Sequence, residues 1–201
     1  MNPHFIFNSL NSINYFISKN DKLSANHYIA DFSRLIRSFL TNLSNDFIPL
    51  ETEIQLLTDY LNLESLRFGD KFTYTLKTDN LSETMACHIF PGIIQPFIEN
   101  AIWHGMSGLE NRVGHIEIHF ELVNNILIKC VIEDNGIGRN LAGSYRSNLP
   151  RKKSRGIGII LERLHLHNKH NKTNYKVIVT DLYPDQQETG TRVVVEIPVK
   201  K

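Results

Sequence analysis

The hydrophobic pattern of this 201-residue chain changes its period at Phe68-Gly69-Asp70. Before that point apolar residues recur every three to four positions, as on one face of a helix, and beyond it many of them alternate, as in strands. Helices followed by mainly antiparallel strands and further helices are typical of an α+β protein. The pattern therefore predicts an N-terminal helical hairpin followed by a two-layer α/β sandwich.

Residues 1–45 predict two amphipathic helices separated by a break at Lys19-Asn20-Asp21. Apolar residues form one stripe along the first helix: Ile6, Leu10, Ile13 and Ile17. Polar residues project from the opposite side: His4, Asn8, Asn11 and Tyr15. Two helices with so short a connection pack as an antiparallel hairpin. Because a hairpin of this size buries little surface alone, we expect it to form a homodimer through a four-helix bundle.

Residues 46–201 predict a second domain, which opens with a helix from Leu50 to Arg67. Pro49, Glu51 and Glu53 favour the start of that helix. Further helices are expected over 91–104 and 158–169, and strands over 72–76, 116–122, 126–132, 175–181 and 192–198. The amphipathic pattern already runs at the second or third residue, which suggests a fragment of a longer protein.

The formal net charge is +1, so no global basic field indicates binding to nucleic acid or to an anionic membrane. No stretch approaches the roughly 20 apolar residues of a membrane span. Basic residues do gather at the end of the polar segment 140–155: Arg151, Lys152, Lys153 and Arg155. A loop of this length is typically functional, and we expect it to attract an anion locally.

Cysteine and histidine give weaker signals. Cys87 and Cys130 form no C-x-x-C pair, and two buried thiols are expected. His165, His167 and His170 do not share a helix face, so their spacing argues against zinc.

The first candidate site is Asp134-Asn135-Gly136-Ile137-Gly138, directly after an expected strand. Glycine lets the backbone approach a ligand closely, and an Asp at a strand end can accept a hydrogen bond from an exocyclic amine such as that of adenine. The same residues are equally compatible with a plain turn.

The second is Arg155-Gly156-Ile157-Gly158, which opens an expected helix. A helix N-terminus exposes N–H donors and carries partial positive charge, so it favours phosphate. An ordinary helix start remains the alternative, although the neighbouring Lys152 and Lys153 favour a triphosphate.

The third is Gln95 to Gly105, which comprises most of the helix expected over 91–104 and the glycine that follows it. Its buried arc is expected to hold four residues: Ile94, Phe97, Ile98 and Ala101. Glu99, Asn100, Trp103 and His104 fall outside that arc. An amide oxygen on such a face can bind Mg²⁺, which prefers oxygen ligands, although a single solvated Asn would look the same.

Together, Glu99-Asn100-Ala101, 134–138, 156–158 and Gly190-Thr191 resemble the N box and glycine boxes of the GHKL ATPase superfamily. That group includes histidine kinases, DNA gyrase, MutL and the ninety-kilodalton heat-shock chaperone. The segment Asn2 to Asn11 resembles the phosphoacceptor motif of the LytS/YehU-type sensor histidine kinases, as do Tyr60 to Phe68 and Gln95-Pro96.

The resemblance implies an ATP:protein-histidine phosphotransferase with His4 as phosphoacceptor. It implies that Asn100 binds Mg²⁺, that Asp134 and Thr191 hold adenine, and that Glu99 occupies the water-polarising position of hydrolysing relatives. The remaining candidate ATP contacts are His104, Gly136, Gly138, Arg155, Gly156 and Gly158. The resemblance also implies a response regulator partner, often of LytTR type, and a cytoplasmic place within a plasma-membrane sensor.

Three positions depart from the resemblance: Trp103, where Lys or Arg is often found, Leu161, where Asn is common, and Phe5, which is not acidic. Two alternative functions also remain open. One is a degenerate ATP-binding scaffold without kinase activity, and the other is a hydrolytic GHKL ATPase.

Overall fold

The computed structural model describes residues 3–43, 45–79, 87–106, 109, 112–124, 126–138, 155–171, 173–185 and 189–199. Its N-terminal part is a hairpin of helices α1 (Pro3–Ser18) and α2 (Lys22–Leu43). Asn20 turns the chain with a φ of 57°, and the Asp21 carboxylate accepts a hydrogen bond of 3.0 Å from the Ser24 backbone N–H, which caps α2. The predicted hairpin is therefore present.

The face of α1 that packs against the rest of the chain is not the predicted apolar stripe. Phe5 is buried, and its ring lies 5.8 Å from the ring of Phe32 in α2 and 5.0 Å from that of Tyr60 in α3. Ile6 and Leu10 are instead exposed. Helix α1 has apolar residues on two sides, and the side with the aromatic ring of Phe5 is the one turned inward.

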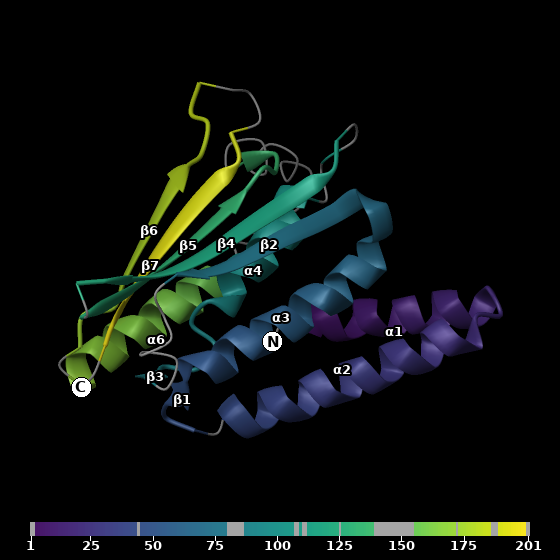
Figure 1. Ribbon diagram of the computed structural model, residues 1–201, viewed down its shortest axis with the longest axis horizontal. Coiled ribbons are helices and arrows are strands. Elements are labelled where there is room, and N and C mark those ends of the chain that lie inside the picture. The colour runs from purple at the N-terminus through teal and green to yellow at the C-terminus, as the bar shows by residue number, and fades with distance from the viewer. Residues whose placement is uncertain are drawn as a thin grey trace.

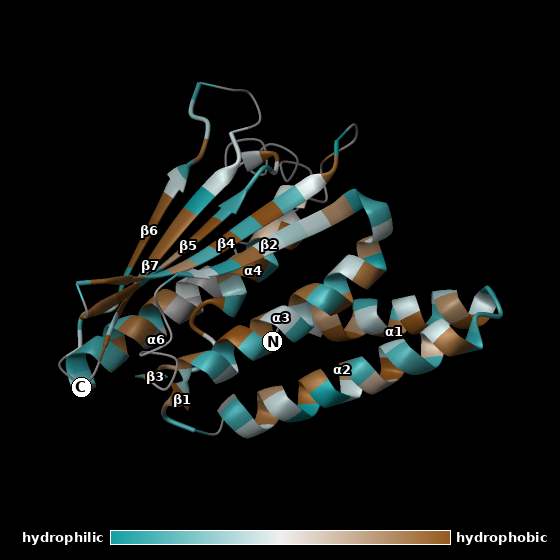
Figure 2. Cartoon of the chain, viewed as in Figure 1, coloured by the Kyte–Doolittle hydropathy of each residue, from teal (hydrophilic) through white to brown (hydrophobic). Residues whose placement is uncertain are grey.

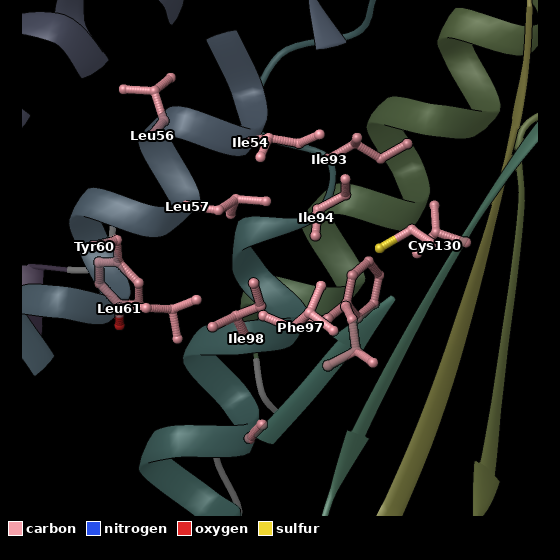
Figure 3. Packing of buried hydrophobic residues seen from close by; sticks show 14 of the residues in the cluster. Ile54, Leu56, Leu57, Tyr60, Leu61, Ile93, Ile94, Phe97, Ile98 and Cys130 are labelled. Atoms are coloured by element: carbon pink, nitrogen blue, oxygen red, sulfur yellow. The ribbon is translucent and has the colours of Figure 1, made fainter. Parts of the chain in front are cut away.

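Helix α3 (Leu50–Phe68) lies between the hairpin and the sandwich (Figure 1). A two-stranded sheet of β1 (Ile48–Pro49) and β3 (His88–Ile89) precedes and flanks it. One side of α3 carries Leu57 and Leu61, which face Ile94 and Ile98 near α4 in the buried core (Figure 3).

The main sheet has the strand order β2-β4-β5-β7-β6. Its strands are β2 (Phe72–Asp79), β4 (Gly114–Val123), β5 (Leu127–Asp134), β6 (Lys176–Asp181) and β7 (Thr191–Pro198). β2 and β4 are parallel, and the other neighbouring pairs are antiparallel. The single-turn η1 (Gly69–Lys71) joins α3 to β2.

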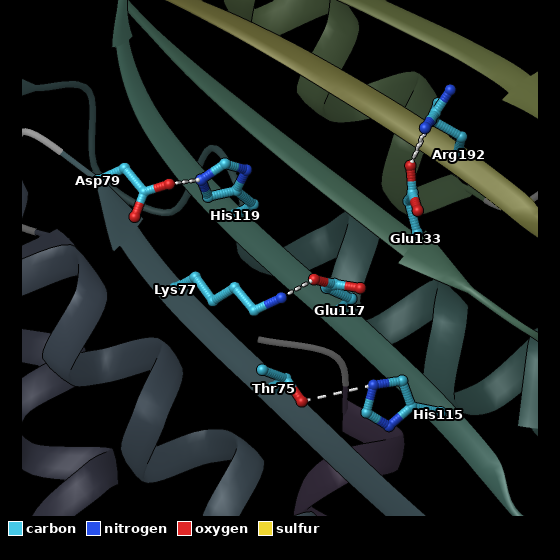
Figure 4. Close-up of polar contacts among 8 residues, drawn as sticks. All are labelled: Thr75, Lys77, Asp79, His115, Glu117, His119, Glu133 and Arg192. Atoms are coloured by element: carbon cyan, nitrogen blue, oxygen red, sulfur yellow. Dashed lines mark hydrogen bonds and ion pairs between the residues drawn. The ribbon is translucent and has the colours of Figure 1, made fainter.

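Helices α4 (Gln95–Asn100) and α6 (Arg155–Asn171) cover one face of this sheet, which gives the two layers (Figure 1). Residues of β4 alternate accordingly: Ile116 and Ile118 are buried, while Glu117 and His119 point to the other face. That other face carries ion pairs such as Lys77–Glu117 at 2.5 Å and Asp79–His119 at 2.7 Å (Figure 4).

The expected α+β architecture, a helical hairpin followed by a two-layer sandwich, is confirmed. The expected helix over 91–104 begins only at Gln95 and widens at Ala101 into a π-helical segment, η2 (Ala101–Met106). Cys130 is buried as expected, but Cys87 is only half-buried. Within the described ranges, no helix has the length and apolar character needed to span a bilayer.

Candidate nucleotide-binding site

Asp134 is a buried acid at the end of β5, beside Thr191 at the start of β7. Its Oδ1 accepts a hydrogen bond of 2.9 Å from the Gly136 backbone N–H, and Thr191 also hydrogen-bonds to the carboxyl group. These donors fix the orientation of the carboxyl group at one end of the sheet.

Burial raises the pKa of Asp134 to about 6, against the lowering effect of the hydrogen bonds from Gly136 and Thr191 and of the Arg112 charge. A carboxyl group whose pKa is strongly shifted by burial is a frequent feature of binding sites. A ligand that donates a hydrogen bond to the ionised form would satisfy it further.

Two distant segments close around Asp134 because they carry glycine. A Cβ atom at Gly136 would lie 2.4 Å from the Gly105 Cα, and one at Gly190 would lie 2.5 Å from the Asp134 carbonyl oxygen. The Ile137 N–H donates to the Gly105 carbonyl at 3.1 Å, and the Gly190 N–H donates to the Gly136 carbonyl at 3.2 Å. The end of η2, the turn after β5 and the start of β7 therefore meet at one point.

The turn after β5 is also held from its other side. The Asn135 side chain accepts a hydrogen bond of 2.7 Å from the His115 N–H and donates one of 3.1 Å to the Val113 carbonyl. Gly138 has a φ of 77°, and a Cβ atom there would lie 1.9 Å from Thr189 Oγ1. The glycines of the predicted box thus have packing reasons of their own, before any ligand is considered.

Helix α4 carries Glu99 and Asn100, both half-buried. The Gln95 side chain donates a hydrogen bond of 2.9 Å to Glu99 Oε1. The Asn100 side-chain nitrogen donates to the Pro96 carbonyl, so this hydrogen bond does not use the amide oxygen. The expected buried arc of Ile94, Phe97, Ile98 and Ala101 is confirmed.

Arg155 and Gly156 open helix α6, earlier than the expected start at Gly158. Gly158 is exposed, and a Cβ atom at that position would meet no atom within 4 Å. Helix α6 packs against α4, so the two predicted ligand-binding helices belong to one layer. The polar segment 139–154 and the side chains of Arg155 and His104 lie outside the described residues.

Residues 1–72 match the protein family described as Histidine kinase. Sensor histidine kinase YpdA of Escherichia coli is 29% identical over 199 residues, covering 98% of this chain and 33% of that protein. Sensor protein LytS of Oceanobacillus iheyensis is 30% identical over 164 residues, covering 80% of this chain and 27% of that protein. The resemblance to the LytS-type sensor histidine kinases is confirmed.

The solved histidine kinase domain of the Erythrobacter litoralis blue-light activated kinase EL346 shares the fold. Its TM-score is 0.50 at 16% identity, over 91% of this chain and 83% of that one. The sandwich of this chain therefore has the fold of that histidine kinase domain. The chain spans about a third or less of the length of its curated relatives, namely 33% of YpdA and 27% of LytS.

The predicted phosphoacceptor of this family, His4, lies in the first turn of α1, and its side chain is outside the described part of the structure. Its neighbour Phe5 is buried against α2 and α3. The structure therefore brings together Asp134, Gly136, Gly138 and Thr191 with Gly105, but it does not place the His4 imidazole relative to them.

Two contacts in this part of the molecule were not predicted from the sequence, which indicated Glu53 only as an acid that favours the start of its helix. Arg112, in the loop before β4, donates a hydrogen bond of 3.3 Å from Nη2 to the Gly136 carbonyl. Glu53, buried in α3, accepts one of 3.0 Å from the Gly92 N–H and thereby holds the turn that leads into α4. Burial raises the pKa of Glu53 to about 7. Both contacts cross long stretches of sequence, so no local motif predicts them.

No group of three or more His, Cys, Asp or Glu side chains in the described ranges is placed to hold a metal ion. Of the three clustered histidines, His165 and His170 are exposed, while His167 is buried against the rings of Phe90 and Tyr175.

Proposed function

We propose that this chain is the phosphoacceptor and ATP-binding part of a sensor histidine kinase, which phosphorylates itself on His4 and passes the phosphoryl group to an aspartate of a response regulator. One observation carries the nucleotide part: the buried Asp134 carboxyl at the junction of three glycine-bearing segments. The family match of residues 1–72, which contain His4, supports the phosphoacceptor part.

In this proposal the ionised Asp134 accepts a hydrogen bond from the adenine amine, with Thr191 beside it. Gly156 and Gly158 open α6, whose N-terminal N–H groups favour phosphate, and Arg155 adds positive charge. His104, Gly136 and Gly138 complete the proposed nucleotide contacts. The chain thus binds the two ends of ATP through different secondary elements.

Asn100 fits the role of Mg²⁺ ligand, because its side-chain nitrogen donates to the Pro96 carbonyl and that hydrogen bond does not use its amide oxygen. When bound, Mg²⁺ neutralises phosphate charge, which is the main electrostatic requirement of phosphoryl transfer. Glu99 is held by Gln95 one residue before this ligand. We assign it a polarising role at the same end of the site.

The transfer itself requires a neutral imidazole nitrogen of His4 to attack the γ-phosphorus. The N–P bond forms while the bond between the γ-phosphorus and the β,γ-bridging oxygen breaks, and ADP leaves with that electron pair. The imidazole proton passes to solvent or to a base. Transfer to the response regulator then exchanges the N–P bond for an acyl phosphate.

We further propose residues 1–45 as the dimerisation and phosphoacceptor hairpin and 46–201 as the catalytic domain. The boundary coincides with the end of α2 at Leu43 and the start of β1 at Ile48. Exposed apolar residues such as Leu10 and Leu23 support a homodimer through the hairpin. A plasma-membrane sensor segment outside this sequence and a LytTR-type response regulator complete the proposal.

The decisive experiment incubates the chain with Mg²⁺ and γ-labelled ATP. We expect acid-labile, alkali-stable label on the protein, which is lost in His4→Gln. His27→Gln is the matched control, because His27 is an exposed histidine of the same hairpin and should leave the label intact. Label that persists in His4→Gln would disprove the acceptor assignment.

Binding and phosphate release separate the alternatives. Mg-ATP binding without any phosphohistidine would favour the degenerate scaffold. Steady phosphate release without label on the protein would favour a hydrolytic ATPase.

A further inference from the structure

A buried ion pair lies where α3 meets the segment that follows Asn100. Glu64 and Arg67, one helical turn apart in α3, form an ion pair through Oε2 and Nη2. The side chain of Glu64 is 1% exposed and that of Arg67 is 15% exposed. Such a pair seldom adds stability over well-packed apolar residues, so its presence calls for a further reason.

The guanidinium of Arg67 is enclosed by two aromatic rings. Its Cζ lies 4.1 Å from the centroid of Phe68 and 4.0 Å from that of Trp103. A planar guanidinium stacks on aromatic faces in a way that a Lys ammonium does not. Since Glu64 holds one edge of the guanidinium, Arg67 in turn holds the indole ring of Trp103.

Trp103 belongs to η2, between Asn100 and Gly105. Gly105 packs directly on the site, because a Cβ atom there would lie 3.0 Å from Asp134 Oδ1. Short π-helical segments inside helices occur often at functional sites. Trp103 therefore lies within the segment that connects the candidate magnesium ligand to the buried acid.

The same cluster extends toward Glu99 and the hairpin. Burial raises the pKa of Tyr60 well above its ordinary value, and the charges of Glu64 and Glu99 raise it further, which places the two acids close to one phenol. Tyr60 is also the residue on which Phe5 packs. The ion pair thus lies between the phosphoacceptor helix and the nucleotide site.

We propose that Arg67 is a positioning residue of the nucleotide site: held by Glu64, its guanidinium fixes the Trp103 ring and thereby the η2 segment that joins Asn100 to Gly105. Arg67 thus brings a cation onto the Trp103 ring from α3. The proposal rests on the proposed function, since it concerns the binding of Mg-ATP.

Trp103 is the only tryptophan in the chain, so intrinsic fluorescence reports on this contact without labelling. We expect Mg-ATP to change the emission of the wild-type chain, because nucleotide binding acts on η2. The variant Arg67→Met should shift the emission of the free protein and lower Mg-ATP affinity about tenfold. Arg67→Lys should lower Mg-ATP affinity almost as much as Arg67→Met does, because Lys retains the charge but lacks the planar group that stacks on the rings.

A double-mutant cycle shows whether Arg67 acts through Trp103. If it does, Arg67→Met and Trp103→Leu each weaken binding measured by calorimetry, and the double variant is about as weak as either single variant. Independent effects would instead multiply, to about a hundredfold for two tenfold losses, and would overturn the proposal. Trp103→Phe, which retains an aromatic face, should bind nearly as the wild type does.

Arg67→Met leaves Glu64 buried without its partner and can fail to fold for that reason. Glu64→Gln combined with Arg67→Met removes both charges and provides the second test. We expect this variant to melt near the wild-type temperature and still to bind Mg-ATP weakly. Wild-type affinity in a folded double variant would overturn the positioning role alone. A wild-type chain that binds no Mg-ATP by calorimetry would overturn the proposed function, and this inference with it.

Discussion

The sandwich and the hairpin bury their apolar residues to very different extents. In β4, Ile116, Ile118 and Phe120 are all 0% exposed beneath the helical layer. In the hairpin, Leu10 is 48%, Leu23 69% and Leu40 64% exposed, and Figure 2 shows apolar positions recurring along α1 and α2. Strand β4 buries its apolar side within one chain, whereas the hairpin leaves several large apolar residues exposed. This contrast is the reason why we propose self-association through the hairpin.

The largest expected effect on stability comes from a comparison of two phenylalanines, one on the buried side of α1 and one on an exposed side. Phe5 is 1% exposed and Phe7 is 65% exposed, only two positions apart. Phe5→Ala should lower the free energy of unfolding by about 3–5 kcal/mol, because it removes a ring packed on Phe32 and Tyr60. Phe7→Ala should change it by less than about 0.5 kcal/mol. Urea unfolding followed by circular dichroism measures both, and equal losses would contradict the described orientation of α1.

The second effect concerns pH, because burial raises the pKa of carboxyl groups in the catalytic part. The pKa of Glu53 and of Glu64 rises to about 7, and that of Asp134 to about 6. A raised pKa means that the folded state holds protons which the unfolded state has released, so stability falls as pH rises from about 4.5 toward 7. In the hairpin, the hydrogen bonds with Ser24 lower the pKa of Asp21, so this carboxyl group makes stability rise rather than fall with pH.

We therefore expect the chain to be more stable at pH 5 than at pH 8. Glu53 alone should account for roughly 2–3 kcal/mol of that difference. Glu53→Gln should flatten the profile while retaining an acceptor for the Gly92 N–H. Urea midpoints across this pH range provide the measurement. An unchanged dependence of stability on pH in Glu53→Gln would refute the role given to Glu53.

Mg-ATP affinity should depend on pH in the opposite sense. It should fall below about pH 6, because Asp134 becomes protonated there.

Apolar periodicity predicted strands such as β5 because buried and partly exposed residues alternate along them. The helix expected from Leu50 to Arg67 ends at Phe68, and the strand expected over 192–198 begins at Thr191. Periodicity did not predict which side of α1 is buried, since both Phe5 and Leu10 lie on apolar sides. Tertiary packing decides between two such sides, and a local pattern contains no information about it.

In the candidate site, too, some features could be predicted from the sequence and others could not. Its glycine-bearing turns could be predicted because their residue types are restricted by backbone approach, as at Gly136 against Gly105. The contacts of Arg67 with Trp103 and of Arg112 with Gly136 could not be, because each joins segments distant in sequence. Periodicity predicted a continuous helix through Trp103, and only the structure shows that it widens into η2 there.

The third prediction separates glycine needed for packing from glycine needed for a ligand. Gly136→Ala places a Cβ atom 2.4 Å from the Gly105 backbone, so it should cost about 1–3 kcal/mol of stability and weaken Mg-ATP binding at least about tenfold. At Gly158 a Cβ atom meets nothing, so Gly158→Ala should keep or raise stability by up to about 1 kcal/mol. If the phosphates of ATP approach that end of α6, Gly158→Ala should lower the affinity for Mg-ATP without lowering stability. A loss of stability in Gly158→Ala, measured by thermal unfolding, would argue against this distinction.

The smallest expected effect on stability contrasts the exposed side of the sheet with the exposed side of the hairpin. The sheet presents ion pairs to solvent, and Lys77→Met removes the one with Glu117 (Figure 4). Because exposed ion pairs contribute little, Lys77→Met should keep the melting temperature and the state of association of the wild type.

Leu10→Glu should likewise leave the melting temperature of the sandwich nearly unchanged. In sedimentation velocity, however, it should convert a dimer to a monomer, because a charge at the hairpin interface would be desolvated. A dimer that survives Leu10→Glu but dissociates with Lys77→Met would place the interface on the sheet, and would reverse the division between the two regions.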